Sequence, residues 1–311
     1  MALVSDTDRG LGPRIHRVLG SLPTWILWIV VVLWSLPTFS LFVNSFRNQE
    51  AQRTTGFWQT QLDEVTIANY REVLEPTIAG GLWDAILNSF AIAIPATIIP
   101  IAIAAFAAYA FAWIDFKGRH WLFIATVSLM AIPLQTALIP LLQMYSGGAH
   151  WTIPFFEKTI TLFPDFDLAG TVTAVWLTHS GFGLPFAIFL LHNYISGLPK
   201  DVFESAFIDG ADHFTSFWRL VVPLSVPVLA AFAIFQFLWT WNDYLIAITM
   251  IGANPDALPA TIKIAALAGE FGIREHLLAA GAFVQAFVPI VVFFALQRFF
   301  VRGILAGSVK G

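Results

Sequence analysis

The most informative part of this chain is Glu204-Ser205-Ala206-Phe207-Ile208-Asp209-Gly210-Ala211, together with Leu220-Val221-Val222-Pro223, which begins after the nine residues that follow Gly210. The stretch is polar and lies between two long apolar runs. Pro199 suits the first position of a helix and Gly210 suits a helix end, so we expect a helix, a turn and a second helix. Its small residues favour a surface on which a soluble partner docks. An amphipathic helix lying on lipid headgroups is the alternative.

The rest of the chain is unusually apolar. Of its 311 residues 58% are hydrophobic and 12% are charged, whereas soluble domains are about 45–50% apolar and about 25% charged. A helix of about 20 apolar residues crosses the hydrocarbon core of a membrane. The sequence therefore predicts an all-α membrane protein with six transmembrane helices, at about 23–43, 85–113, 121–145, 171–194, 221–251 and 277–301.

The distribution of basic residues predicts the orientation of these spans, because Lys and Arg near span ends favour the cytoplasmic side. With six spans both termini share one side, and that side holds most of the basic residues: Arg9, Arg14, Arg17, Lys117, Arg119, Lys200, Arg219, Arg298, Arg302 and Lys310. We therefore expect both termini to be cytoplasmic. Residues 1–22 form a cytoplasmic tail and residues 23–311 one transmembrane domain. The first apolar run lacks a cleavage site and is expected to be a retained signal anchor.

Several kinds of chemistry have no sequence support. The chain has no cysteine, so it cannot form disulfides or thiolate sites. It has no G-x-x-x-x-G-K-[ST] motif for nucleotide phosphates, and His179, His192 and Asp243 do not have the spacing of a metal or catalytic site. No basic stripe points to nucleic acid. We expect neither catalytic residues nor a metal site, and therefore not an enzyme.

The segment 196–223 resembles the EAA loop of the membrane subunits of binding-protein-dependent ABC importers. The loop in that family has the form E-A-A, three residues, G, nine residues, I-x-L-P. Glu204, Ala206, Gly210 and Pro223 match this form, and the departures from it are Ser205, Leu220 and Val222. The C-terminal stretch Gln297-Arg298-Phe299-Phe300-Val301-Arg302-Gly303 is similar to the maltose-type sugar permease branch, and residues 181–185 and 224–241 look most like its α-glucoside members.

This resemblance implies the type I permease fold of ABC importers and an assembly in the cytoplasmic (inner) membrane of a prokaryote. The implied partners are a second permease subunit, two ATPase subunits that bind ATP-Mg, an extracytoplasmic sugar-binding protein, membrane lipid and the sugar, an oligosaccharide or α-glucoside. The chain itself binds no cofactor. Segment 196–223 becomes the coupling loop, which docks into the ATPase. The outer segment 252–275 would face the binding protein.

The resemblance also assigns residues to the coupling loop. Glu204 would pair with a basic residue of the ATPase, while Ala206 and Gly210 would allow close approach. Asp209 would be a helix-end or partner contact. The full set that matches the loop is Glu204, Ser205, Ala206, Asp209, Gly210, Ala211 and Pro223.

A route for an uncharged sugar needs polar groups that replace its hydration. The side chains suited to line it are Gln135, Gln236, Asn242 and Tyr244, although each also suits an interhelical hydrogen bond. Asp243 suits a bond to a helix end or a sugar contact. An ion-coupled secondary transporter is the alternative class, but such proteins usually carry ionisable residues at mid-membrane, and Asp243 is the exception in otherwise apolar spans. The alanines of the second span indicate helix packing.

Overall fold

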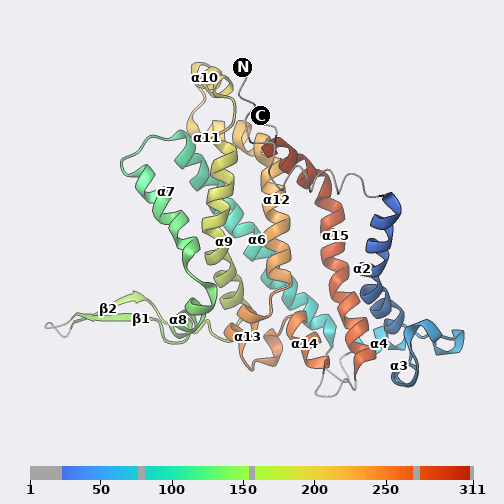
Figure 1. The fold of residues 1–311 in the computed structure, drawn as a ribbon. Coiled ribbons are helices and arrows are strands. Elements are labelled where there is room, and N and C mark those ends of the chain that lie inside the picture. Colours follow the sequence, from blue (N-terminus) through green and yellow to red (C-terminus); the bar gives the residue numbers. More distant parts are fainter. Residues whose placement is uncertain (1–22, 76–80, 154–157, 269–273, 309–311) are drawn as a thin grey trace, which may run out of the picture.

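The computed structural model describes residues 23–75, 81–153, 158–268 and 274–308. The predicted tail 1–22 lies outside this part. Among these described residues, five helices are long and apolar enough to cross a membrane. They are α2 (Thr24–Ser45), α6 (Leu82–Trp113), α9 (Val172–Ile195), the helical run His213–Trp241, which ends in α12 (Val222–Trp241), and α15 (Glu275–Ser308). In α15 the apolar portion is Glu275–Gln297. In Figure 1 these helices stand side by side as one bundle. The start of α2 and the end of α15 lie at the end of the bundle that carries α10 (Lys200–Ile208).

The predicted third span is wrong as a single helix. It consists of α7 (Arg119–Ser128), the 3₁₀ turn η4 (Leu129–Ala131) and α8 (Leu134–Gly147), and the two halves are bent by 100°. Pro133 has no N–H and restricts the preceding Ile132 to extended backbone, which Ile132 adopts with φ −74° and ψ 118°. Non-helical backbone at membrane depth must be covered by protein or by water, so this bend is expected to face another chain or an aqueous cavity.

The predicted fifth span, 221–251, is also divided. Helical structure runs without a break from His213 to Trp241, stops at Asn242-Asp243-Tyr244 and resumes as α13 (Leu245–Ile251). The side-chain carboxylate of Asp243 accepts a hydrogen bond from the backbone N–H of Ala247 at 3.0 Å. The backbone carbonyl of Asp243 accepts a second one from Thr261 Oγ1 at 2.9 Å. The expected bond between Asp243 and a helix end is confirmed.

The core of the bundle lies where α6 packs on α9. Ala104 and Ala108 of α6 and Ala187 and Leu191 of α9 are fully buried in one apolar cluster. Small side chains let two helices approach closely. The predicted packing role of the alanines in the second span is therefore confirmed.

Gln236 joins three helices near the centre of the bundle. Its side chain is fully buried, and its Nε2 donates to the carbonyls of Ala96 at 3.1 Å and His179 at 3.3 Å. The amide fits only because Gly183 has no side chain, since a Cβ there would lie 2.5 Å from Gln236 Oε1. Helices α6, α9 and α12 are therefore fastened by a glutamine that needs a glycine opposite it.

We predict that Gly183→Ala destabilises the bundle although alanine is the better helix former. Overpacking a dense core costs about 1–3 kcal/mol, more than the gain of about 1 kcal/mol expected from replacing a helical glycine. Thermal unfolding of the purified protein in detergent would measure this. Gly181→Ala is the matched control, because a Cβ at Gly181 meets nothing within 4 Å, and it should leave the midpoint unchanged or higher. Equal midpoints for both variants would contradict the prediction.

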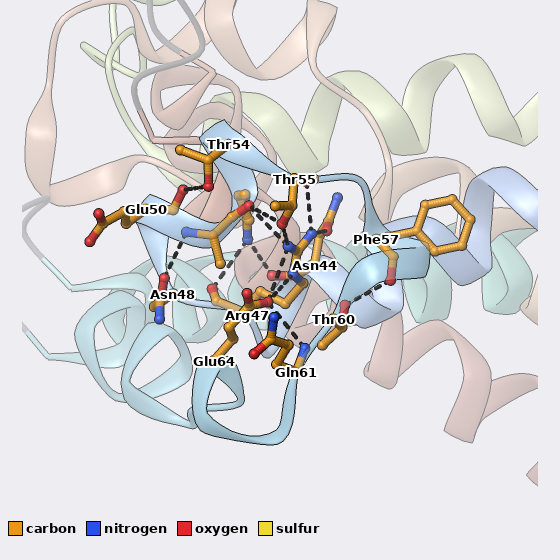
Figure 2. A network of polar contacts seen from close by, with 12 residues as sticks. Asn44, Arg47, Asn48, Glu50, Thr54, Thr55, Phe57, Thr60, Gln61 and Glu64 are labelled. Carbon is orange, nitrogen blue, oxygen red and sulfur yellow. Dashed lines mark hydrogen bonds and ion pairs between the residues drawn. The ribbon is translucent and has the colours of Figure 1, made fainter.

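The outer end of α2 and α15 carries a small cap built around a buried arginine. The cap contains α3 (Gln49–Thr54), the turns η2 (Phe57–Gln59) and η3 (Leu62–Glu64), and the short helix α4 (Ala68–Leu74). Arg47 is 1% exposed and lies 3.2 Å from Glu64 Oε2. It also donates to the carbonyls of Ala51 at 2.9 Å and Thr55 at 3.2 Å, as Figure 2 shows. A buried cation with these partners fixes the fold of an otherwise polar segment.

Two further outer segments contain secondary structure in their described residues. A hairpin of two antiparallel strands, β1 (Ala149–Ile153) and β2 (Lys158–Phe163), follows α8 and was not predicted. The segment 252–275 contains the turn η6 (Pro255–Ala257) and α14 (Ala260–Leu267). Ile262, Ile264 and Leu267 of α14 are buried, whereas Ala265, Ala266 and Ala268 face outward.

Candidate functional site

The first half of the coupling loop is a short helix closed by a glycine. Helix α10 starts after Pro199 and ends at Ile208, with Asp209 as its C-cap. Gly210 has φ +85°, and its N–H donates to the Phe207 carbonyl at 3.1 Å. The N–H of Ala211 reaches the Ala206 carbonyl at 2.9 Å. This pair of bonds is a Schellman C-cap, in which glycine is strongly favoured because of its positive φ. The predicted helix end at Gly210 is confirmed.

The second half begins with a capped turn that continues into the membrane span. The Asp212 carboxylate accepts the Thr215 N–H at 2.7 Å at the start of α11 (His213–Ser216), and hydrogen bonds from Thr215 lower the pKa of this carboxyl group. A π-helical turn, η5 (Phe217–Val221), then joins α11 to α12. Pro223 is the second residue after this turn and has no N–H to donate to the preceding helical turn. A movement of the loop therefore reaches the span through continuous helix.

The free surface of α10 is mixed polar and apolar. Ile208 is 85% exposed, and Val202 and Phe207 are also exposed. The polar residues Glu204, Ser205 and Asp209 are exposed beside these apolar side chains. An exposed apolar patch rimmed by polar residues marks an interaction site.

The opposite side of α10 is fastened to the bundle by an aromatic stack. Phe203 is fully buried, and its ring stacks on Trp113 with the ring centres 4.0 Å apart. Trp113 ends helix α6 and donates its indole N–H to the Ile195 carbonyl, at the end of α9, at 3.2 Å. Helix α10 is therefore attached to the inner ends of two spans at once.

A second attachment holds the other half of the loop. The Tyr109 hydroxyl lies 2.9 Å from His213 Nδ1, and the ring of Phe217 stacks on Phe106 with the centres 4.3 Å apart. Tyr109 and Phe106 both belong to α6. These pairs could not be predicted from the sequence, because the partners are about 100 residues apart in the chain.

The four residues expected to line a sugar route do not come together. Gln236 is buried and forms the interhelical bonds described above. Gln135 is exposed on α8. Asn242 and Tyr244 are exposed beside the break after α12, where Asn242 Nδ2 donates to the Leu238 carbonyl at 2.8 Å. None of the four lines the cavity that the structure shows beside the bent third span.

The structure instead shows a cavity of about 610 Å³ between the bent pair α7–α8 and helices α9 and α12. Its wall is mostly apolar and aromatic, with Phe182, Phe186 and Trp239. Tyr145 and Thr178 supply hydroxyl groups, and Thr178 Oγ1 donates to the Tyr145 hydroxyl oxygen at 3.3 Å. The sequence could not predict this cavity, because it exists only where the third span bends.

Residues 101–306 match the family described as binding-protein-dependent transport system inner membrane component. The match includes the coupling loop and more than half of the chain. The chain therefore belongs to this family, and it is a multi-pass inner-membrane permease subunit of an ABC importer, a transport subunit and not an enzyme.

Individual relatives agree with this assignment. The chain is 47% identical over 286 residues to the osmoprotective compounds uptake permease protein GgtD of Synechocystis sp., covering 90% of this chain and 89% of that protein. It is 50% identical over 256 residues to the alpha-glucoside transport system permease protein AglG of Rhizobium meliloti, covering 82% of this chain and 63% of that relative. It is 33% identical over 251 residues to the trehalose transport system permease protein SugB of Mycobacterium tuberculosis, covering 79% of this chain and 83% of that protein.

Solved structures show the same fold. A chain of a bacterial ABC transporter that imports alginate superposes with a TM-score of 0.69 at 17% identity, over 92% of this chain and 98% of that one. A chain from a bacterial alginate transporter in complex with a periplasmic protein gives a TM-score of 0.65 at 14% identity, over 94% and 97%. The expected importer permease fold is confirmed.

Proposed function

We propose that this chain is a membrane-spanning subunit that moves a sugar, of the oligosaccharide or α-glucoside class, into the cell. The relatives with 50% and 33% identity are named for alpha-glucoside and trehalose transport. The spans carry few charged groups, which suits an uncharged solute.

The observation that carries the proposal is the construction of the coupling loop. Ile208 and its neighbours are exposed on one side of α10, while Phe203 is stacked on Trp113 on the other. A cytosolic ATPase that grips the exposed side would therefore push directly on the ends of α6 and α9. Two ATPase subunits would supply the force, and ATP-Mg would be bound by those subunits and not by this chain. A second permease subunit would complete the membrane part.

The sugar route would run along the cavity beside the bent third span. Aromatic faces such as Trp239 and Phe182 suit the apolar faces of a sugar ring, and the hydroxyl groups of Tyr145 and Thr178 suit its polar edge. Asn242, Tyr244 and Gln135 would contribute only at its rims, since they lie outside the wall of the cavity. An extracytoplasmic sugar-binding protein would deliver the sugar from the outer side, where Ala265, Ala266 and Ala268 of α14 form an open face for it.

Reconstitution would test this function. The complete importer, in liposomes that contain ATP, should take up a radiolabelled α-glucoside when the binding protein is present. Uptake should vanish when ATP is left out or replaced by a non-hydrolysable ATP analogue. It should continue in the presence of a proton ionophore. Uptake that follows an ion gradient without ATP would instead support an ion-coupled secondary transporter, and ATP-driven uptake restricted to another solute class would reject the sugar.

A further inference from the structure

The hairpin β1–β2 has two chemically different faces. Across the strands Trp151 pairs with Ile160, and Ile153 with Lys158. Side chains alternate along a strand, so these four residues share one face, while the register shift between Ala149 and His150 places Leu162 in a β-bulge at the base of the hairpin. The other face carries two polar pairs, with 3.2 Å between His150 Nδ1 and Thr161 Oγ1 and 3.0 Å between the hydroxyl groups of Thr152 and Thr159.

The apolar face is left uncovered by the described part of the chain. Trp151 is 56% exposed and Ile160 is 39% exposed. A lone two-stranded hairpin is at best marginally stable in water, so this face needs an apolar surface opposite it. The hairpin is nonetheless held firmly at its base. A Cβ at Gly148 (φ +72°) would lie 2.7 Å from the carbonyl oxygen of Phe163, and the Phe163 ring packs on Tyr145.

The position of the hairpin points to what covers it. In Figure 1 the strands project sideways from the bundle, at the level of the outer ends of α8 and α9 and across the direction of the long helices. Segments α3, α13 and α14 extend farther outward than the hairpin does. A hairpin at this depth lies along the membrane surface, and a protein approaching from outside would reach the other segments first.

We propose that the apolar face of the hairpin lies in the headgroup region of the outer leaflet of the membrane. Tryptophan is enriched at that depth because its ring is apolar and its N–H is polar. Ile160 enters the upper acyl region, while Lys158, at the far end of the same face, reaches lipid phosphates from its long stem. His150 and the threonines face water. The hairpin thereby anchors α8, the outer half of the bent span, against the lipid surface.

The absence of cysteine from the chain allows a direct test with single labels. Ile160→Cys and its neighbour Thr159→Cys, which lie in the regular register and point to opposite faces, are each labelled with an environment-sensitive fluorophore. Each variant is incorporated as the complete importer into nanodiscs with or without lipids that carry a nitroxide near the headgroup. We expect the nitroxide to quench the label at residue 160 several-fold and the label at residue 159 much less. Both positions are exposed, so folding should be normal, and an unchanged unfolding midpoint verifies this.

Three results would overturn the proposal. Equal quenching at both positions would show that neither face is selected by lipid. No quenching at residue 160, combined with shielding of its label when the binding protein is added, would assign the face to that protein. No quenching combined with cross-linking of residue 160 to the second permease subunit would assign it to a subunit interface. The assay measures position and not transport, so its outcome is independent of the proposed sugar.

Discussion

Gly210→Glu is expected to abolish uptake while the protein remains in the membrane at its normal level. The glycine lies at the exposed bend of the coupling loop, and a Cβ there meets nothing within 4 Å of this chain. The new side chain therefore meets no steric clash within the permease, and its charge is harmful only against a docked ATPase. An unpaired charge buried at an interface costs about 2–5 kcal/mol, and every 1.4 kcal/mol lowers affinity about tenfold. Uptake in liposomes and co-purification of the ATPase subunits would measure the effect.

Two control variants separate this effect from backbone strain. Gly210 has φ +85°, and a residue other than glycine loses about 1–2 kcal/mol in that conformation. Gly210→Ala carries this strain without the charge, and Gly210→Asn carries less strain because asparagine tolerates positive φ. Both should retain much of the uptake. If alanine is as harmful as glutamate, the helix end and not the docking surface is the sensitive feature. Normal uptake by Gly210→Glu would contradict a docking role for this bend.

Phe203→Ala should uncouple the loop from the spans. The ring is fully buried and stacks on Trp113, and the loss of a buried phenylalanine from a core costs about 3–5 kcal/mol. Helix α10 would then be held mainly through the Tyr109–His213 and Phe217 contacts at the other half of the loop. We expect the ATPase subunits to bind and hydrolyse ATP, but the binding protein to stimulate hydrolysis weakly and uptake to fall at least tenfold. The ratio of sugar molecules imported to ATP hydrolysed would measure this.

Phe214→Ala is the control for this variant. It removes the same side chain from the same loop, but Phe214 is 67% exposed. It should leave the import ratio and the unfolding midpoint nearly unchanged. A Phe203→Ala variant that is present at the normal level and imports sugar with the normal ratio would show that force reaches the spans by another route.

The coupling loop was largely predictable because its signals are local. Pro199, Asp212 and Gly210 act within one turn of their own position, through caps and backbone conformation, so the sequence defined the two short helices and the bend. The sequence did not show which of Phe203 and Phe207, one helical turn apart, is buried. Only the packing against Trp113 buries the first, while the second is left 38% exposed.

The membrane spans show the same division. Composition was enough to locate five spans, because each apolar run acts alone toward lipid. The third apolar segment was also located, but not its break into two helices. Hydropathy does not reveal that the chain turns by 100° at Pro133 rather than bending slightly. The four residues expected on a sugar route also did not converge. A polar side chain in an apolar run can face a cavity or fasten helices, and Gln236 fastens them through Ala96 and His179.

By itself the sequence determined that this chain is a helical membrane protein with a loop shaped for a soluble partner, because hydropathy, charge bias and helix caps depend on residues close together in the chain. The tertiary structure decided which side of α10 is free, where the third span breaks to open a cavity, and that a hairpin leaves the bundle with one apolar face uncovered. Each of these depends on contacts between residues far apart in the sequence, and no local pattern specifies which partner a side chain will meet.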